Sequence, residues 1–272
     1  MRPGQLHVAI VGAGATGSEL AAELYRTTRE VVAYGLDRID PERDIRIVLI
    51  EAAKRILPGG LPKHISGATH RLLEQIGVEV RIGAKVTEVT AEGLSLADGT
   101  FIASELVVWA AGVKAPEVLG RLDGLEINRI NQLVVERTLQ TTSDPAIFAI
   151  GDCAACPRPG ASTPVPPRAQ AAHQEAAHMA GQIERRLRGK PLRPYTYRDF
   201  GSLVSLGNWS TVGNLMGLPF FRNVFVEGLF AQIMYRSLRL MHERAIGGTR
   251  RAVLSVLGRA LAHRTEPPVK LH

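Results

Sequence analysis

The feature that most constrains this chain is the glycine-rich stretch "HVAIVGAGATGSELAAEL" at residues 7–24. Gly12, Gly14 and Gly17 form the pattern G-x-G-x-x-G between an apolar run of strand length and a stretch with helical periodicity. The first glycine permits a tight turn, the second lets a pyrophosphate approach the backbone, and the third lets helix and strand pack closely. The stretch therefore predicts a dinucleotide whose phosphates lie at the helix N-terminus, and a glycine-rich turn without a ligand is the alternative.

Residues 1–115 read as one α/β unit, because apolar runs of strand length alternate with stretches of helical periodicity. Between residues 85 and 104, apolar and polar residues alternate around glycine turn signals, which predicts a small antiparallel meander. A parallel sheet with such a meander is a Rossmann-like dinucleotide-binding architecture, as in two-domain flavoprotein reductases. We predict strands at 6–11, 45–51, 78–83 and 106–113, the last of them buried, and helices after residue 14 and around 64–76.

Glu51 ends the second predicted strand, where a carboxylate would hydrogen-bond the adenosine ribose hydroxyls of a dinucleotide. A 2′-phosphate at that place would face a negative charge, so the sequence favours NADH over NADPH. Gly17 and Glu51 are 34 residues apart rather than about 20, which requires an insertion in the crossover. Lys54 and Arg55 follow closely and weaken the rejection of a phosphate.

Two further segments follow the predicted nucleotide domain. Residues 116–200 hold a short strand "QLVVE", a second apolar run "IFAIG" that reads as a strand, a Pro-rich turn region, and a long helix "RAQAAHQEAAHMAGQIERRLRG". Residues 201–272 begin with the β-rich stretch "GSLVSLGNWSTVG" and continue into two predicted helical segments, near 224–244 and 250–263. The sequence therefore predicts three regions in chain order.

Basic charge is concentrated in the C-terminal tail. From residue 220 onward nine Lys and Arg stand against three acids, a net of +6 in a chain whose net charge is +7. Each predicted tail helix carries an apolar arc opposite a basic arc, which is typical of a helix lying in an anionic membrane interface. Nucleic acid is a poorer partner, because aromatic residues do not interleave with the basic ones. A helix pair that forms a core or a homodimer is the alternative.

Targeting signals do not appear in the sequence. The apolar run near the N-terminus breaks at Gly12, too early for a signal peptide, and no stretch reaches the ~18 apolar residues of a spanning helix. We therefore expect the protein in the cytosol or on the cytosolic side of a membrane.

The two cysteines, Cys153 and Cys156, are too few for a disulfide framework. Their C-x-x-C spacing suits a redox dithiol or half of a zinc site. Pro157 and Pro159 follow, however, where a helix would lower a thiol pKa, and no second C-x-x-C pair supplies further zinc ligands. We expect a packing role for both cysteines and no metal.

Three stretches give the chain a specific resemblance. "TTSDPAIFAIGDCA" resembles the second flavin motif of two-dinucleotide-domain flavoproteins, in which an Asp, here Asp152 after Gly151, reaches the ribityl and pyrophosphate region. "PPRAQAAHQ" is similar to the A-Q-x-A-x-Q signature of type II NADH:quinone oxidoreductases, with Gln170 and Gln174 at the glutamine positions. The tail from "GSLVSLGNWSTVG" to "KLH" resembles the C-terminal region of the proteobacterial members. The resemblance covers essentially the whole chain in order.

The resemblance implies FAD and NADH as cofactors and a membrane quinone as electron acceptor. A hydride would pass from NADH to the flavin and two electrons on to quinone, without proton pumping. Gln170 and Gln174 lie four apart on one helical face and would hydrogen-bond a quinone carbonyl, the alternative being two solvated glutamines. The family further implies a peripheral location on the cytoplasmic face of the inner membrane.

The resemblance also implies functional roles for Glu19 and Gly112. Glu19 matches the family's acid near the nicotinamide and quinone pockets, where it would tune hydride geometry or supply a proton. An acid that simply favours the helix N-terminal dipole is the alternative. Gly112, in "WAAGV", would allow close approach of the backbone to the cofactor.

Family members carry, ahead of this segment, another α/β half with its own glycine fingerprint for FAD. The given sequence goes straight to the NADH fingerprint, so residues 116–200 would be only part of the FAD domain, and 201–272 an α+β membrane-associating region. The "IFAIG" strand would then lack its neighbours, and we expect poor FAD binding and marginal stability. Two hypotheses follow: the C-terminal two-thirds of an NADH:quinone oxidoreductase, or a non-catalytic NADH-binding, membrane-associating remnant.

Overall fold

The computed structural model describes residues 2, 4–35, 38–58, 61–206, 210–215, 224–227, 237, 240, 243–244, 246–256 and 258. The chain divides into two compact units. The first combines the described residues up to Ala111 with those from Gly201 onward, and the second runs from Gly112 to Phe200. The region after Gly201 thus belongs to the same unit as the glycine fingerprint.

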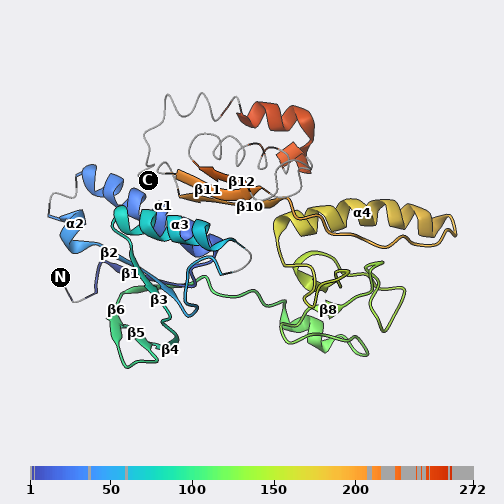
Figure 1. Ribbon diagram of the computed structural model, residues 1–272, viewed down its shortest axis with the longest axis horizontal. Coiled ribbons are helices and arrows are strands. Elements are labelled where there is room, and N and C mark those ends of the chain that lie inside the picture. The colour runs from blue at the N-terminus through green and yellow to red at the C-terminus, as the bar shows by residue number, and fades with distance from the viewer. Residues whose placement is uncertain are drawn as a thin grey trace. The chain divides into compact units, whose positions relative to one another are not determined.

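A four-stranded parallel sheet forms the centre of the first unit (Figure 1). In the order of the sheet the strands are β3 (Glu79–Ile82), β2 (Arg46–Glu51), β1 (His7–Val11) and β7 (Leu106–Trp109). The interiors of β1 and β2 are buried apolar runs, as expected where both faces of a sheet are covered. The predicted α/β nucleotide-binding fold is therefore confirmed.

The prediction that strand β7 is buried is wrong. It stands last in the order of the described sheet, beside β1, and both Leu106 and Trp109 are exposed. An apolar run of this length suits a central strand and an edge strand equally, so the sequence pattern could not distinguish them.

Two helices cover one face of the parallel sheet, and a second sheet packs on these helices (Figure 1). The helices are α1 (Ala15–Ala33) and α3 (Lys63–Gln75), and the antiparallel strands are β10 (Gly201–Leu206), β11 (Ser210–Leu215) and β12 (Val224–Glu227). Val204 and Leu206 of β10 are fully buried in the same cluster as Ala21 of α1 and Leu73 of α3. The C-terminal sheet therefore contributes directly to the core of the nucleotide domain.

The predicted meander is confirmed and covers the opposite face of the parallel sheet. Its strands are β4 (Val86–Val89), β5 (Gly93–Leu96) and β6 (Phe101–Ala103). Leu94 and Ile102 pack in one buried cluster with Ala9 of β1 and with Val48 and Ile50 of β2.

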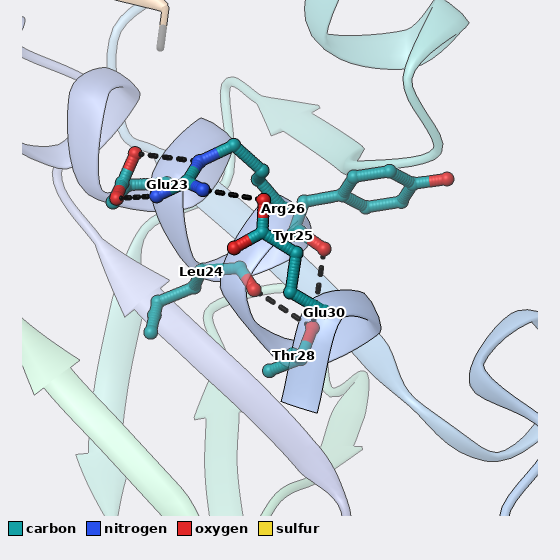
Figure 2. A network of polar contacts seen from close by, with 6 residues as sticks. All are labelled: Glu23, Leu24, Tyr25, Arg26, Thr28 and Glu30. Carbon is teal, nitrogen blue, oxygen red and sulfur yellow. Dashed lines mark hydrogen bonds and ion pairs between the residues drawn. The ribbon is translucent and has the colours of Figure 1, made fainter. Parts of the chain in front are cut away.

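Helix α1 and the short helix α2 (Pro41–Asp44) fill the long spacing between the fingerprint and Glu51. Figure 2 shows the polar side of α1, where the Arg26 guanidinium lies between Glu23 and Glu30. The Thr28 hydroxyl donates to the Leu24 carbonyl one turn earlier, at 2.7 Å. Pairs three and four residues apart stabilise a helix by a few tenths of a kcal/mol each, roughly, so they support a helix of this length.

The second unit is built on helix α4 (Ala169–Leu187) and two very short strands, β8 (Leu133–Val134) and β9 (Ala154–Ala155). Its buried cluster includes Leu139, Cys156 and Met179. The predicted "IFAIG" strand is wrong: in the described structure its residues lie outside the named strands, and Phe148 forms one isolated bridge to Gln140. An apolar run becomes a strand only where another strand is available to pair with it.

The first predicted helix of the tail is corrected at its start, because Val224–Glu227 is strand β12. The described residues at 237, 240 and 243–244 are helical, as are 246–256 and 258 in the second predicted segment. The other residues of these two segments lie outside the described structure. Among the helices that the structure does describe, none is both long enough and apolar enough to cross a bilayer.

Candidate functional site

The structure gives a separate geometric reason for glycine at each of the three fingerprint positions. Gly12 follows β1 with φ +104°, and its N–H donates to the Ile50 carbonyl at 2.7 Å. A Cβ on Gly17 would lie 1.9 Å from the Gly12 carbonyl oxygen, so only glycine lets α1 approach the turn this closely. A Cβ on Gly14 would meet nothing within 4 Å, which leaves this side of the backbone open to a ligand.

Gly14 is the N-cap of α1, with an extended backbone and no side-chain cap. The first turn of the helix contains no acidic residue, and the half-buried Glu19 lies beyond it. Backbone N–H groups at such a helix start can hydrogen-bond an anion, and the helix dipole favours negative charge there. The arrangement suits the pyrophosphate of a dinucleotide.

Glu51 binds the fingerprint turn directly. Its carboxylate accepts the Ala13 N–H and the Ala53 N–H, each at 2.9 Å. The Ala13 carbonyl in turn accepts the Leu57 N–H at 2.7 Å, and Leu57 is buried with φ +50°. A positive φ is uncommon outside glycine, so surrounding contacts must hold the loop in this shape. The acid therefore fixes the loop, and its contact with a ribose stays a prediction.

The carboxyl ends of β1 and β7 form the place where the strand order reverses. The Ala110 N–H donates to the Val11 carbonyl at 2.8 Å and continues the pairing past β7. Trp109 is 61% exposed, and its indole N–H donates to the Ala111 carbonyl at 3.0 Å. Gly112 follows with φ +76° and open space around its Cβ position. Ligands of open α/β sheets bind at such a switch point.

In the second unit two buried polar side chains hold the loop around Gly151 and Asp152. The Gly151 N–H, at φ +67°, donates to Glu175 Oε2 at 2.5 Å. The Gln132 amide donates to the Asp152 carbonyl at 3.1 Å, and the Asp152 side chain is exposed. The buried side chains of Glu175 and Gln132 thus hold the loop from the protein interior, while the Asp152 carboxylate faces solvent.

Glu175 is a residue that sequence reasoning missed. It is only 2% exposed, and burial raises the pKa of its carboxyl, although the Gly151 N–H acts in the opposite direction and the nearby Asp152 raises it further. Its burial could have been predicted from its spacing, because it lies four residues after Ala171 and four before Met179 and so shares the buried face of α4 with them.

Cys156 lies fully buried in the same unit. Burial, with a smaller contribution from Glu175, raises the pKa of its thiol to about 11. A thiol is nucleophilic only as the thiolate, so this one is unreactive near neutral pH. The structure supports the packing role for Cys156.

The glutamines of the A-Q-x-A-x-Q signature contact the chain that returns along α4. The Gln174 amide accepts the Arg198 N–H at 3.0 Å and donates to the Arg198 carbonyl at 2.8 Å. The Gln170 amide accepts the Phe200 N–H at 3.1 Å and donates to Asp199 at 3.3 Å. The sequence suggested neither pairing, because the partners lie 24 to 30 residues away. Each amide NH2 carries two hydrogens, so the Gln174 amide has one more hydrogen than its printed bond to Arg198 uses.

Residues 2–176 match the model of the pyridine nucleotide-disulphide oxidoreductase family, and the chain belongs to this family. Within it, the chain is similar to the type II NADH:quinone oxidoreductases. It is 45% identical to the enzyme of Haemophilus influenzae over 98% of this chain and 60% of that protein. It is 31% identical to NdhA of Mycobacterium tuberculosis over 89% of this chain and 51% of that protein. The resemblance inferred from the sequence is thereby confirmed.

Solved structures agree on the fold. NDH2 of Plasmodium falciparum in complex with NADH superposes with a TM-score of 0.78 at 18% identity, over 97% of this chain and 67% of that one. A ferredoxin reductase of Rhodopseudomonas palustris gives 0.59 at 22% identity, over 84% of this chain and 58% of that one. The chain spans about 60% of the length of its Haemophilus relative.

Proposed function

We propose that this chain is the NADH-binding and quinone-facing part of an FAD-dependent NADH:quinone oxidoreductase that pumps no protons. The observation that carries the proposal is the clamped fingerprint turn, in which Glu51 binds Ala13 beside the open backbone of Gly14. This turn occurs in a chain 45% identical to a type II NADH:quinone oxidoreductase.

On the coenzyme side, the start of α1 at Gly14 binds the pyrophosphate and Glu51 binds the adenosine ribose. The nicotinamide end then extends toward the switch point at the carboxyl ends of β1 and β7, where Gly112 leaves room beside the backbone. Glu19 is the acid that adjusts the position of the nicotinamide or provides a proton to the quinone.

The loop at Gly151 and Asp152 suits the sugar-like chain of a flavin. Asp152 presents an exposed carboxylate that can accept ribityl hydroxyls, and the Glu175 contact with Gly151 keeps the loop from moving. When bound, FAD supplies the chemistry that takes up a hydride and releases two electrons. Gln170 and Gln174 orient the quinone through their amide groups and also hold the returning chain against α4.

The proposed activity is tested with the purified chain supplied with FAD. We expect it to bind NADH, and to oxidise it with a short-chain ubiquinone analogue in proportion to the FAD that it retains, which the sequence predicts to be little. Gln174→Met should lower quinone reduction about tenfold, the equivalent of one hydrogen bond to a polar acceptor, with unchanged NADH affinity. The matched control is Gln140→Met, because Gln140 contacts Pro145 in a turn of the second unit.

Three outcomes separate the hypotheses. NADH binding with no flavin retained and no turnover supports the non-catalytic NADH-binding alternative. If Gln174→Met and the unmodified chain turn over equally fast, Gln174 only holds the segment at Arg198 and does not bind the quinone. Absence of NADH binding rejects both functions.

We also propose that the tail contacts an anionic membrane surface, at the cytoplasmic face of the inner membrane. In helical residues 246–256, Ile246 is 91% exposed and Leu254 67% exposed, and their spacing puts them on one face with the exposed Val253. Arg251 is exposed one turn before Leu254, so a basic side chain borders the apolar ones. This pairing of apolar and basic surfaces suits a helix in the plane of an interface. A homodimer through the same face is the alternative.

We expect the protein to float with vesicles that contain phosphatidylglycerol, and less with vesicles of phosphatidylcholine alone, because anionic lipid attracts the basic tail. Leu254→Glu should strongly reduce flotation. Leu187→Glu, at a side chain 83% exposed near the end of α4, is the matched control. Undiminished flotation of Leu254→Glu would contradict the membrane role. Loss of a dimer in sedimentation, without any vesicle binding, would favour the homodimer.

A further inference from the structure

One side of helix α4 carries a row of mainly apolar side chains, most of them exposed in the described structure. The row alternates spacings of four and three residues along the helix: Ala169, His173, Ala176, Ala180, Ile183 and Leu187. Ile183 is 52% exposed and Leu187 83%, the three alanines are exposed, and His173 is half-buried. We call this row the α4 seam. Scattered apolar side chains are ordinary on a protein surface, but a continuous row of them indicates a contact site.

The seam lies on a side of α4 that differs from its two contact sides within the chain. The core side consists of buried residues: Ala171, Glu175, Met179 and Gln182. The side that hydrogen-bonds the returning chain at residues 193–200 consists of three polar residues: Gln170, Gln174 and His178. At 3.6 residues per turn, the seam falls on the remaining side and faces away from both.

Side-chain size changes along the seam in a way that suits a second copy of the same helix. The seam begins with alanines and ends in Ile183 and Leu187. If two such helices run antiparallel about a twofold axis at Ala180, Ile183 of each faces Ala176 of the other. Leu187 likewise faces His173. Bulky side chains then meet smaller ones as knobs meet holes, and alanine at the centre lets the helices approach closely. A twofold contact of this kind is self-complementary.

The distribution of charge favours the same antiparallel arrangement. The end of α4 is basic: Arg185, Arg186 and Arg188. A parallel pair would bring these basic ends side by side. In the antiparallel pair the two Arg186 residues lie about 18 Å apart along the axis, which exceeds the screening length of ~8 Å at physiological salt. Arg185 and Arg186 also donate to the carbonyls of Pro191 and Pro145, away from the seam.

Two helices joined along one seam bury little surface compared with a permanent dimer. Interfaces of less than about 1,200 Å² are typical of transient association. We therefore expect a dimer that forms at tens of micromolar protein, roughly, and dissociates below about 1 µM. Vesicle flotation at about 0.1 µM protein thus reports on the monomer, so the Leu187→Glu control described above remains valid there.

We infer that the α4 seam is an interface through which two copies of this chain pair antiparallel, with the twofold axis at Ala180. The interface is independent of the proposed electron transfer, because Gln170, Gln174 and the loop at Asp152 lie outside the seam. It also differs from a dimer through the tail, whose described helical residues belong to the other compact unit.

Sedimentation velocity of the full chain from about 1 to 200 µM tests the association. We expect a sedimentation coefficient that rises with concentration. Ile183→Glu should weaken the association about tenfold or more, because each copy then brings a charge into an apolar contact. Val118→Glu, at an exposed apolar side chain of the same unit in the turn at 117–121, is the matched control and should leave the association unchanged. A thermal melt of each variant that matches the unmodified chain shows that its fold is intact.

Disulfide formation tests the antiparallel register at high protein concentration, because a disulfide requires Cβ atoms about 3.5–4.5 Å apart. Ala180→Cys should crosslink to its own copy across the twofold axis. Ala176→Cys alone should not crosslink, whereas an equal mixture of Ala176→Cys and Ile183→Cys should, since these positions face each other. The unmodified chain, with its free Cys153 and Cys156, gives the background.

Each contrary result has one meaning. A chain that stays monomeric at all these concentrations overturns the interface, and so does a dimer that Ile183→Glu leaves intact. A dimer lost in Leu254→Glu but kept in Ile183→Glu belongs to the tail. Crosslinking of Ala176→Cys to its own copy overturns the antiparallel order in favour of a parallel pair. The proposed NADH and quinone chemistry stands or falls separately from all of these results.

Discussion

Gly17→Ala is expected to destabilise the first unit by about 3 kcal/mol and to abolish NADH binding, because an added methyl group overpacks a close backbone contact. Its Cβ would lie 1.9 Å from the Gly12 carbonyl oxygen, and a backbone atom cannot rotate away as a side chain can. Helix α1 must then move off β1, which also displaces the N–H groups at Gly14. Chemical denaturation and NADH titration measure the two losses.

Gly14→Ser is the matched variant, and its two effects should have opposite signs. A Cβ at Gly14 meets no atom within 4 Å, and serine is a better N-cap than glycine, so stability should rise by a few tenths of a kcal/mol, roughly. The same Cβ would stand where the pyrophosphate approaches, so NADH affinity should fall by about tenfold or more. Unchanged stability of Gly17→Ala would show that α1 does not depend on this contact.

Glu175→Leu and Glu175→Gln are expected to differ by about 2 kcal/mol in the free energy of unfolding, with the leucine variant the less stable. Leucine leaves the Gly151 N–H without its acceptor, and a lost buried hydrogen bond costs about 1–3 kcal/mol. Glutamine keeps an acceptor oxygen and avoids burying a charge. Urea denaturation of the two variants measures the difference.

The pH dependence of the unmodified chain gives an independent check on Glu175. Its pKa in the folded state is raised above the ordinary 4.5, so the folded protein keeps a proton that the unfolded chain releases. Stability from this group is therefore fully present below pH 4.5 and is lost as the pH rises through the folded pKa. Between pH 4.5 and the folded-state pKa of Glu175, the unmodified chain should therefore lose stability relative to the Glu175→Gln variant.

The control for this experiment is Glu184→Gln, at an exposed acid of the same helix that pairs with Arg188. Its stability should change by less than about 0.5 kcal/mol, as usual for exposed pairs. A constant stability difference between the unmodified chain and Glu175→Gln from pH 4 to 8, roughly, would contradict a protonated carboxyl at this position.

Local patterns predicted most of the first unit. The strands ending at Val11 and Glu51 are where the apolar runs place them, and the meander forms at the glycine turns. The errors share one physical origin, since the run at "IFAIG" and the start of the tail helix at Val224 depend on which partner strands are present. Pairing partners distant in the sequence leave no periodic signal.

The candidate site divides in the same way. Glu51 was placed by its position at the end of an apolar run, but only the structure shows that it binds Ala13 and Ala53. The signature identified Gln170 and Gln174 in the sequence. Their hydrogen bonds to residues 198–200 could not be predicted, because those partners lie far away along the chain. Glu175 escaped sequence reasoning, because its burial depends on packing between segments that no single motif contains.

By itself the sequence determined the strand–turn–helix of the fingerprint and the character of the unit around it. Those features follow from the steric freedom of Gly12 and Gly17 and from apolar periodicity, which act over a few neighbouring residues. Tertiary structure alone decided that the sheet after Gly201 covers α1 and α3, and that Gly151 is held by a buried acid. These contacts join segments far apart in the chain, and burial and hydrogen-bond partners are properties of the folded path rather than of local sequence.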